Sequence, residues 1–329
     1  MKKKLTIGVL LGGPSSERAV SLVTGEAVYK NLDRQKYIVK RIELTTKGEF
    51  IFVPEKGKKR TLDLVNKDRK FVDLMFVALH GTPGEDGTVQ GMLQLLDIPF
   101  TGPNTLASAI AMNKVRTADI YRSVGIPTPA FVHFTRAEWN KNKQTLLKKI
   151  TAEIRFPAVI KPVDQGSAVG VEIPKNKTEL EAGITRVFKK FNWLMVQKYI
   201  HGHEATCGVL ERKGVPFALP PTHILANYGA FYDYASKYTA GGSTHICPAD
   251  FSKNVNAKIQ ALAVKAHRAL WCRGMSRTDI FVDENKNVWA IETNTIPGMT
   301  PTSLLPEAAK AAGISFGEML DLIISAALA

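Results

Sequence analysis

The first hundred residues alternate apolar runs of strand length with amphipathic stretches of helix length. The apolar runs are Leu5–Leu11, Val39–Glu43 and Leu74–Leu79, and a helical pattern covers about Val20–Leu32. Such alternation predicts βαβ units, in which parallel strands are joined by helices that pack on the sheet. The sequence therefore predicts an α/β fold with a parallel sheet for its N-terminal part.

Two of the predicted strands run directly into loops rich in glycine. The first is followed by Gly12-Gly13, and the third by the stretch from His80 to Gly87. Ligands of open α/β sheets bind at the carboxyl ends of the strands, so both loops are expected to border a binding site. For His80 two interpretations are equally good, a hydrogen-bonded histidine that caps the sheet or a group that contacts substrate.

Glu17 lies between the first predicted strand and the helix that follows it. Its carboxylate can complement the positive end of the helix dipole. Alternatively it can hold a substrate ammonium in a closed cleft, where an unpaired carboxylate would be costly. The local pattern by itself favours the first role and leaves the second open.

After residue 103 the pattern changes. A helical stretch, 104–125, leads into the rigid connection Ile126–Pro129, and strands and helices then mix as in an α+β unit. Strands dominate from Leu194 onward, followed by a helix at Asn256–Trp271 and a closing apolar helix. The predicted segments are 1–103, 104–194 and 195–329, the last with a lid loop and a metal site.

Oxygen ligands gather beside an arginine in the last third of the chain. Glu292 and Asn294 are two residues apart, so on a strand both side chains leave the same face, and Asp279, beside Arg277, can add a third oxygen. Carboxylate and amide oxygens suit Mg²⁺, which completes its shell with water and substrate phosphates. A polar strand edge would give the same spacing, and the pattern alone leaves the two explanations at similar odds.

A lysine at a predicted strand end, Lys161, precedes a loop with Gly166, Ser167 and Gly170. The glycines allow backbone N–H groups to approach an anion such as a nucleotide phosphate. The loop lacks the Gly-Lys-Ser/Thr of a P-loop, and as an isolated motif it is more often an ordinary turn.

The segment Tyr232–Tyr238 is polar and aromatic and lacks apolar periodicity. It predicts a lid that keeps water from a reactive intermediate, with a surface loop as the alternative.

The net charge of +14 raises the question of nucleic acid. The basic runs Glu55–Arg60 and Lys141–Lys149 lack the interleaved aromatic residues of a single-strand binder, so a solvated face that attracts an anionic nucleotide explains them as well. Three scattered cysteines suit a reducing compartment, and no apolar stretch is long enough to span a membrane. We therefore expect a cytoplasmic protein.

In order, from residue 5 to about 320, these segments resemble the D-alanine–D-alanine ligases of the ATP-grasp superfamily. The matching stretches are LLGGPSSERAVSL, ALHGTPGEDGTVQGMLQLLDIPFTG, the KP-x3-GS-x-VG loop, YDYASKY, R-x-D, and E-x-N-T-x-PGMT followed by Ser303-Leu304. The resemblance implies an ATP-grasp fold behind a Rossmann-like parallel-sheet domain. It also implies ATP-dependent joining of two D-alanine molecules through an acyl phosphate, for peptidoglycan synthesis.

The resemblance also implies roles for the substrate residues. Glu17 would bind the first D-alanine's ammonium and connect through Ser167 to Tyr238, with His80 in the same subsite. Arg277 and the backbone N–H of Gly298 would form the oxyanion site. Ser303 and Leu304 would receive the second substrate's carboxylate.

For ATP, the implied phosphate ligands are Lys114, Lys161 and Lys237. Glu204 would hold the ribose, and Gln197, Lys198 and Ile200 would surround the adenine. Two Mg²⁺ ions, replaceable by Mn²⁺, would bind Asp279, Glu292 and Asn294.

Gln197 for glutamate, Ala168 for serine and Ala235-Ser236 for Glu-Ala depart from the family pattern and are expected to tune binding without abolishing chemistry. Asn113 for aspartate is a further departure. Tyr238 favours D-alanine over D-lactate as second substrate. The alternatives are another ATP-grasp carboxylate–amine or D-alanine–D-lactate ligase, and a basic nucleic-acid-binding protein with a vestigial site. A homodimer without specific nucleic acid or membrane partners is expected.

Overall fold

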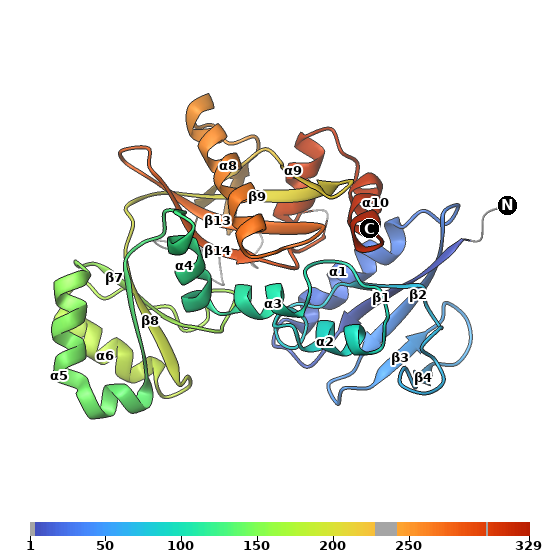
Figure 1. Cartoon of the computed structure of the whole chain (residues 1–329), viewed down its shortest axis with the longest axis horizontal. Helices are drawn as coiled ribbons and strands as arrows, with labels where there is room; N and C mark the ends of the chain where they lie inside the picture. The colour runs from blue at the N-terminus through green and yellow to red at the C-terminus, as the bar shows by residue number, and fades with distance from the viewer. Residues whose placement is uncertain (1–3, 228–241, 301) are drawn as a thin grey trace.

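The computed structural model of the chain describes residues 4–227, 242–300 and 302–329, and within these ranges three sheets carry the fold (Figure 1). The expected lid, with Lys237 and Tyr238, lies outside the described residues. The observed architecture is the mixed α/β and α+β arrangement that the sequence predicts.

The N-terminal unit is a sheet of strand order β4-β3-β2-β1-β5. Its elements are β1 (Leu5–Gly12), α1 (Arg18–Asn31), β2 (Tyr37–Leu44), β3 (Phe50–Val53), β4 (Arg60–Leu62), β5 (Leu74–Val77) and α2 (Thr88–Leu95). The central strand β1 is parallel to β2 and β5, as predicted, and is buried on both faces. The antiparallel strands β3 and β4 and the helix α2 are additions that the apolar pattern did not predict.

The middle unit is an antiparallel sheet of order β6-β8-β7, with helices on its outer side (Figure 1). Its elements are β6 (Phe131–Thr135), α5 (Arg136–Glu153), β7 (Ala158–Pro162), α6 (Lys177–Val187) and β8 (Trp193–Lys198). Ile160 and Val196 pack into the core under the helices. Side chains alternate along a strand, so Val159, Lys161 and Gln197 face away from these helices.

The C-terminal sheet runs, over the described residues, in the order β12-β11-β9-β13-β14, and β10 pairs with β9. Its elements are β9 (Gly202–Arg212), β10 (Val215–Ala218), β11 (Thr222–Ala226), β12 (Ser243–Ile246), α8 (Lys253–Ala269), β13 (Met275–Asp283) and β14 (Val288–Asn294). One face packs on α8 through Cys207, Ile280 and Ala290. The opposite face of this sheet carries Thr206 and Asp279, because side chains alternate along a strand.

Two predicted helices are each divided in the structure. The stretch 104–125 forms α3 (Thr105–Met112) and α4 (Lys114–Ser123), because Asn113 is extended and its side chain accepts from the Arg116 N–H to cap α4. The closing apolar pattern forms α9 (Leu304–Ala311) and α10 (Phe316–Ala327), the second opened by a capping box at Ser315.

These four helices connect the units. Helices α3 and α4 pack against β14, and α10 packs against β9 and α1. Leu305 and Leu320 consequently share one apolar core with Leu10 of the N-terminal sheet. Strand β8 begins at Trp193, next to the predicted start of the strands at Leu194, and it pairs within the middle sheet. None of the helices in the described ranges has the length and apolar character needed to cross a membrane.

Candidate active site

Strands β13 and β14 bring the predicted oxygen ligands and arginine onto one face of the C-terminal sheet. Asp279 lies opposite Glu292, and Arg277 lies opposite Asn294. Arg277 donates from Nε and Nη2 to the two carboxylate oxygens of Asp279, at 3.0 Å each. Asn294 Nδ2 donates to Asp279 Oδ2 at 3.1 Å, and Thr206 Oγ1 donates to Asp279 Oδ1 at 2.7 Å. Arg277, Asp279 and Asn294 therefore form one hydrogen-bonded cluster, and Glu292 lies beside it, opposite Asp279.

The side chains of this cluster fit a magnesium ion that takes some of its ligands from the protein and the others from water and substrate. Asp279 and Glu292 supply two carboxylates, and Asn294 adds an amide oxygen. No group of three or more His, Cys, Asp or Glu side chains in the described parts of the chain is arranged to hold a metal by itself. Mg²⁺ commonly keeps several waters and takes oxygens from substrate phosphates, so an incomplete protein shell is what it needs. The side chains of Arg277, Asp279 and Glu292 are only 14–21% exposed, which is low for the polar edge of an ordinary strand.

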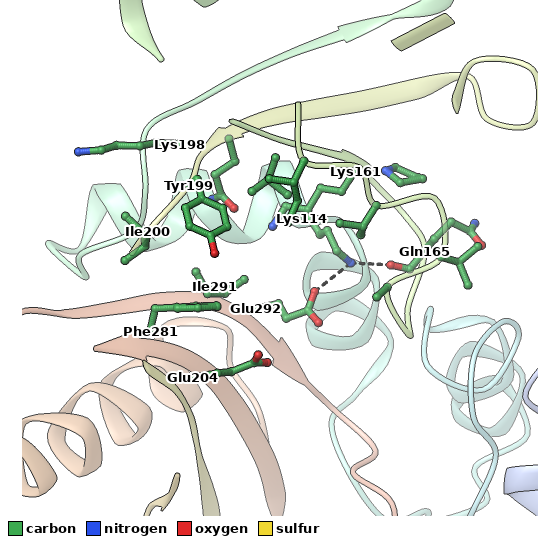
Figure 2. Close-up of a pocket in the computed structure, with 17 residues that line it drawn as sticks. Lys114, Lys161, Gln165, Lys198, Tyr199, Ile200, Glu204, Phe281, Ile291 and Glu292 are labelled. Atoms are coloured by element: carbon green, nitrogen blue, oxygen red, sulfur yellow. Dashed lines mark hydrogen bonds and ion pairs between the residues drawn. The ribbon is translucent and has the colours of Figure 1, made fainter. Parts of the chain in front are cut away.

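A cavity of about 840 Å³, part of it open to solvent, lies between the middle and C-terminal sheets (Figure 2). The predicted nucleotide residues that the structure describes all line it: Lys114, Lys161, Gln197, Lys198, Ile200 and Glu204. Figure 2 shows Lys114 bridging its two sides, with Nζ 3.0 Å from Glu292 Oε2 and 2.6 Å from the Gln165 carbonyl oxygen.

Lys161 lies almost fully inside this cavity wall, with 6% of its surface exposed. Burial lowers its pKa to about 8; Glu292 raises that pKa and Lys114 lowers it further. Two lysines thus face one nearby carboxylate. An anionic ligand would stabilise both ammonium groups, so the cavity is electrostatically prepared for a polyphosphate.

On the other side of the cluster, the loop after β1 meets the glycine loop after β7. Ser167 Oγ donates to Glu17 Oε1. Ser167 and Ala168 both have left-handed backbones, with φ of 51° and 56°, a conformation that costs non-glycine residues roughly 1 kcal/mol or more. Glu17 stands at the N-cap position of α1, yet its side chain makes no capping hydrogen bond. This geometry favours the substrate role of Glu17 over a role in helix capping.

Gly81 allows the glycine loop after β5 to lie close to Ser15 and Glu17 in the loop after β1. Its φ is +67°, and a Cβ there would lie 2.9 Å from Glu17 Oε2 and 2.3 Å from Ser15 Oγ. Only glycine combines this backbone conformation with the space required. The two loops that the sequence predicts to gather at the sheet edge are therefore packed against each other.

His80 is buried beneath these loops and satisfies the first of its two interpretations. Its Nε2 lies 2.9 Å from Thr24 Oγ1, and it also bonds to the Ile296 backbone. Burial lowers its pKa to about 4, with Glu17 raising it and Arg277 lowering it. His80 is therefore a neutral imidazole at pH 7, and Glu17 and Arg277 both act on its ring electrostatically.

Glu85 is a candidate site residue that the sequence interpretation did not include. One carboxylate oxygen accepts from the Gly81 N–H at 2.7 Å. Burial, followed by the charge of Glu17, raises the pKa of Glu85 to about 8. The available signal was a charged residue inside the glycine-rich stretch His80–Gly87, since a carboxyl group there is carried into the same sheet edge.

Ser303 and Leu304 begin helix α9. Ser303 Oγ accepts from the Thr300 N–H at 3.0 Å, and a Cβ on Gly298 would lie only 2.9 Å from that oxygen. The Leu304 side chain is buried, so its backbone N–H is the group that can meet a ligand. Helix N-termini favour carboxylates, which agrees with the predicted subsite.

Two family models together match nearly the whole chain, the D-ala D-ala ligase N-terminus over residues 6–103 and the D-ala D-ala ligase C-terminus over residues 120–325. A D-alanine–D-alanine ligase of Syntrophobacter fumaroxidans is 40% identical over 327 residues, covering 99% of this chain and 98% of that protein. One from Desulforamulus reducens is 42% identical over 326 residues, covering 98% and 99%.

Solved structures agree with these matches. VanG D-Ala:D-Ser ligase from Enterococcus faecalis has a TM-score of 0.89 at 32% identity, covering 99% of this chain and 100% of that one. D-alanine–D-alanine ligase from Bacillus anthracis, complexed with ATP, has a TM-score of 0.78 at 33% identity, covering 98% and 97%. Because these matches extend over nearly its whole length, the chain belongs to the D-alanine–D-alanine ligase family.

Proposed function

We propose that this protein joins two D-alanine molecules into D-alanyl-D-alanine with hydrolysis of ATP to ADP and phosphate. The observation that carries the proposal is the position of the Arg277–Asp279 pair. It lies between a lysine-lined cavity suited to a nucleotide and the Glu17–Ser167 contact suited to an amino-acid ammonium. Membership of the ligase family supports the same assignment.

In the first step, a carboxylate oxygen of the first D-alanine attacks the γ-phosphorus of ATP. The bond to the β-phosphate oxygen breaks, giving an acyl phosphate and ADP. Glu17 holds the ammonium of this D-alanine, while Lys114 and Lys161 offset the phosphate charge. Phosphoryl transfer needs mainly such positioning and charge neutralisation.

In the second step, the amine of the second D-alanine, having lost a proton, attacks the acyl carbon. Arg277 and the Gly298 N–H stabilise the oxyanion of the tetrahedral intermediate, which then expels phosphate to form the peptide bond. The N-terminus of α9, at Ser303 and Leu304, holds the carboxylate of this second substrate.

Asp279, Glu292 and Asn294 would hold Mg²⁺, with Mn²⁺ as a substitute. When bound, the metal supplies positive charge to the β- and γ-phosphates. The protein side chains of the cluster fix where that charge is placed.

One observation favours a second candidate, D-serine as the second substrate. Among the solved structures compared above, the D-Ala:D-Ser ligase has the higher TM-score, 0.89 against 0.78. The two activities share the first step and differ only in the amine that attacks.

The test is a phosphate-release assay with ATP, Mg²⁺ and D-alanine, together with mass spectrometry of the product. We expect release that depends on D-alanine, is absent with L-alanine, and yields D-alanyl-D-alanine. Mixtures of D-alanine with D-serine or D-lactate identify the second substrate by product mass. Salt-sensitive retention on DNA without D-alanine-dependent phosphate release would instead favour the nucleic-acid alternative.

For peptidoglycan synthesis this dipeptide is made in the cytoplasm, and we propose that location together with a homodimeric state. Size-exclusion chromatography with light scattering measures the latter directly.

A further inference from the structure

Gln197 is one of the residues that line the nucleotide cavity. It sits near the end of β8, where its backbone is opposite Phe131 on one side and Val159 on the other. Directly opposed residues of neighbouring strands share a face, and Val159 and Gln197 both line the cavity. The neighbouring Val196 points instead into the core under α5 and α6. The Gln197 side chain is therefore aimed into the cavity.

This side chain is a buried amide with an unmet hydrogen bond. Only 3% of Gln197 is exposed, and its Nε2 is buried without a partner among the described residues. Buried amide N–H groups in proteins are nearly always paired, so the unpaired donor points to a ligand atom that accepts from it. Val159, Ile173 and Phe281, which also line the cavity, offer only apolar contact.

Related ligases usually carry a glutamate at this position. Glutamine and glutamate differ in the hydrogen bonds that they can make with a nucleotide base. A carboxylate only accepts hydrogen bonds, whereas a glutamine amide has an accepting oxygen and a donating nitrogen. Rotation of the amide by half a turn exchanges the two. The 6-amino group of adenine donates, and the 6-oxo group of hypoxanthine or guanine accepts. Gln197 can match either group, while a carboxylate repels the second.

We propose that Gln197 sets the nucleotide specificity of this protein, so that the base subsite takes 6-oxo purine nucleoside triphosphates as well as ATP. The proposal rests on the proposed function, because it concerns the phosphoryl donor of that ligation. The specificity arises from the amide of one residue, which lies opposite the apolar Val159 in the cavity wall.

The experiment compares ATP with inosine triphosphate, which carries a 6-oxo group and no 2-amino group. We measure kcat/KM for D-alanine-dependent phosphate release with each nucleotide in the native protein, Gln197→Glu and Gln197→Met. The native protein should use the two nucleotides within about tenfold of each other. In Gln197→Glu the preference for ATP should rise by at least about tenfold, since a carboxylate cannot donate to the 6-oxo group.

Gln197→Met is the matched control, because it keeps the length of the side chain and removes both donor and acceptor. It should lower kcat/KM for both nucleotides while leaving their ratio near that of the native protein. A strong native preference for ATP that Gln197→Glu leaves unchanged would overturn the proposal. So would an equal rise of that preference in the methionine and glutamate variants.

Equilibrium binding separates this proposal from the proposed function. Dissociation constants for ATP and inosine triphosphate, measured without D-alanine, report the base subsite even if no ligation occurs. A ratio near one in the native protein, raised at least about tenfold by Gln197→Glu, supports the role of Gln197. A ratio that the variant does not change contradicts it, whatever the outcome of the ligation assay.

Discussion

The nucleotide end and the substrate end of the cleft carry buried ionisable groups of opposite kinds, lysines at the first and glutamates at the second. At the nucleotide end, Lys114 and Lys161 face Glu292, and burial lowers the pKa of Lys161 to about 8. At the substrate end, Glu17 and Glu85 lie near each other, and burial with that neighbour raises the pKa of Glu85 to about 8. The shift at the nucleotide end disfavours a second ammonium charge, and the shift at the substrate end disfavours a second carboxylate charge.

This difference teaches what each end is prepared to bind. A polyphosphate would relieve the buried lysines, and an ammonium would relieve the paired carboxylates. The Arg277–Asp279 pair lies where the two ends meet, with its charges mutually neutralised by two hydrogen bonds. A negative charge that develops only in the transition state therefore meets a guanidinium that is already held in place.

Removing that central guanidinium should have the largest effect. Arg277→Lys keeps a positive charge but cannot donate through two nitrogens to Asp279, so the remaining ammonium is no longer fixed. We expect kcat to fall by about 10²–10³, the loss typical of one oxyanion donor, with a smaller change in KM for ATP. Steady-state phosphate release measures both.

Arg273→Lys is the matched control. Arg273 lies just before the same strand and donates to the carbonyl oxygens of Phe100 and Gly102, away from the cluster. It should change kcat by less than about threefold, because its contacts lie away from the cluster. Equal losses in the two variants would show that Arg277 acts only through the stability of β13.

A crossed pair of substitutions, of intermediate effect, sharpens the comparison between the ends. Lys161→Met should raise KM for ATP by about 10–100-fold and leave KM for D-alanine within a few-fold, because it removes one phosphate contact. Glu17→Gln should do the reverse, raising KM for D-alanine through the lost ammonium contact. Initial rates over a grid of ATP and D-alanine concentrations separate the constants. If both variants raised the same constant, the two ends would not be distinct sites.

The smallest effect concerns stability and Glu85. Its folded pKa of about 8 lies above its ordinary value of 4.5, so the folded protein holds a proton that the unfolded chain releases. The sign follows from linkage: this group's stabilising contribution is complete below pH 4.5 and is lost as pH rises through about 8. Glu85→Gln, which cannot ionise, should match the native protein at pH 5 and exceed it at pH 9.

Thermal unfolding at these two pH values, without ligands, measures the difference. We expect the variant to melt about 2–6 °C above the native protein at pH 9, as about 1–2 kcal/mol of ionisation cost disappears. The control is Glu26→Gln at a surface carboxylate that pairs with Lys30 and Arg41. A melting difference for Glu85→Gln that stays constant with pH would contradict the assigned pKa.

Elements with a clear apolar period were predictable from the sequence. β1 and β5 appear where uninterrupted apolar runs require burial, and the glycine loops after them meet at one edge as parallel pairing demands. The hairpin β3–β4 was missed because its strands are short, partly exposed and polar at the end. The break between α3 and α4 at Asn113 was missed because a polar residue can also occur inside a helix. Only its extended backbone identifies Asn113 as an N-cap.

For the site, the sequence supplied the residue types and tertiary structure supplied their distances. The spacing of Glu292 and Asn294 places both on one face of any strand, because side chains alternate. That Asp279 lies opposite Glu292 depends on the register of β13 and β14. Glu85 was missed because its importance comes from burial beside Glu17, a quantity that one-dimensional spacing does not contain.

By itself, the sequence determined the alternation of strand and helix, the glycine loops and the chemical character of every candidate ligand, since these depend on neighbours along the chain. Tertiary structure alone decided which of them share a cleft, which carboxyl group is held protonated, and that the Gln197 amide has a donor without a partner. The physical reason is that desolvation, hydrogen-bond pairing and electrostatic interaction act through space, between residues as far apart in the chain as Glu17 and Ser167.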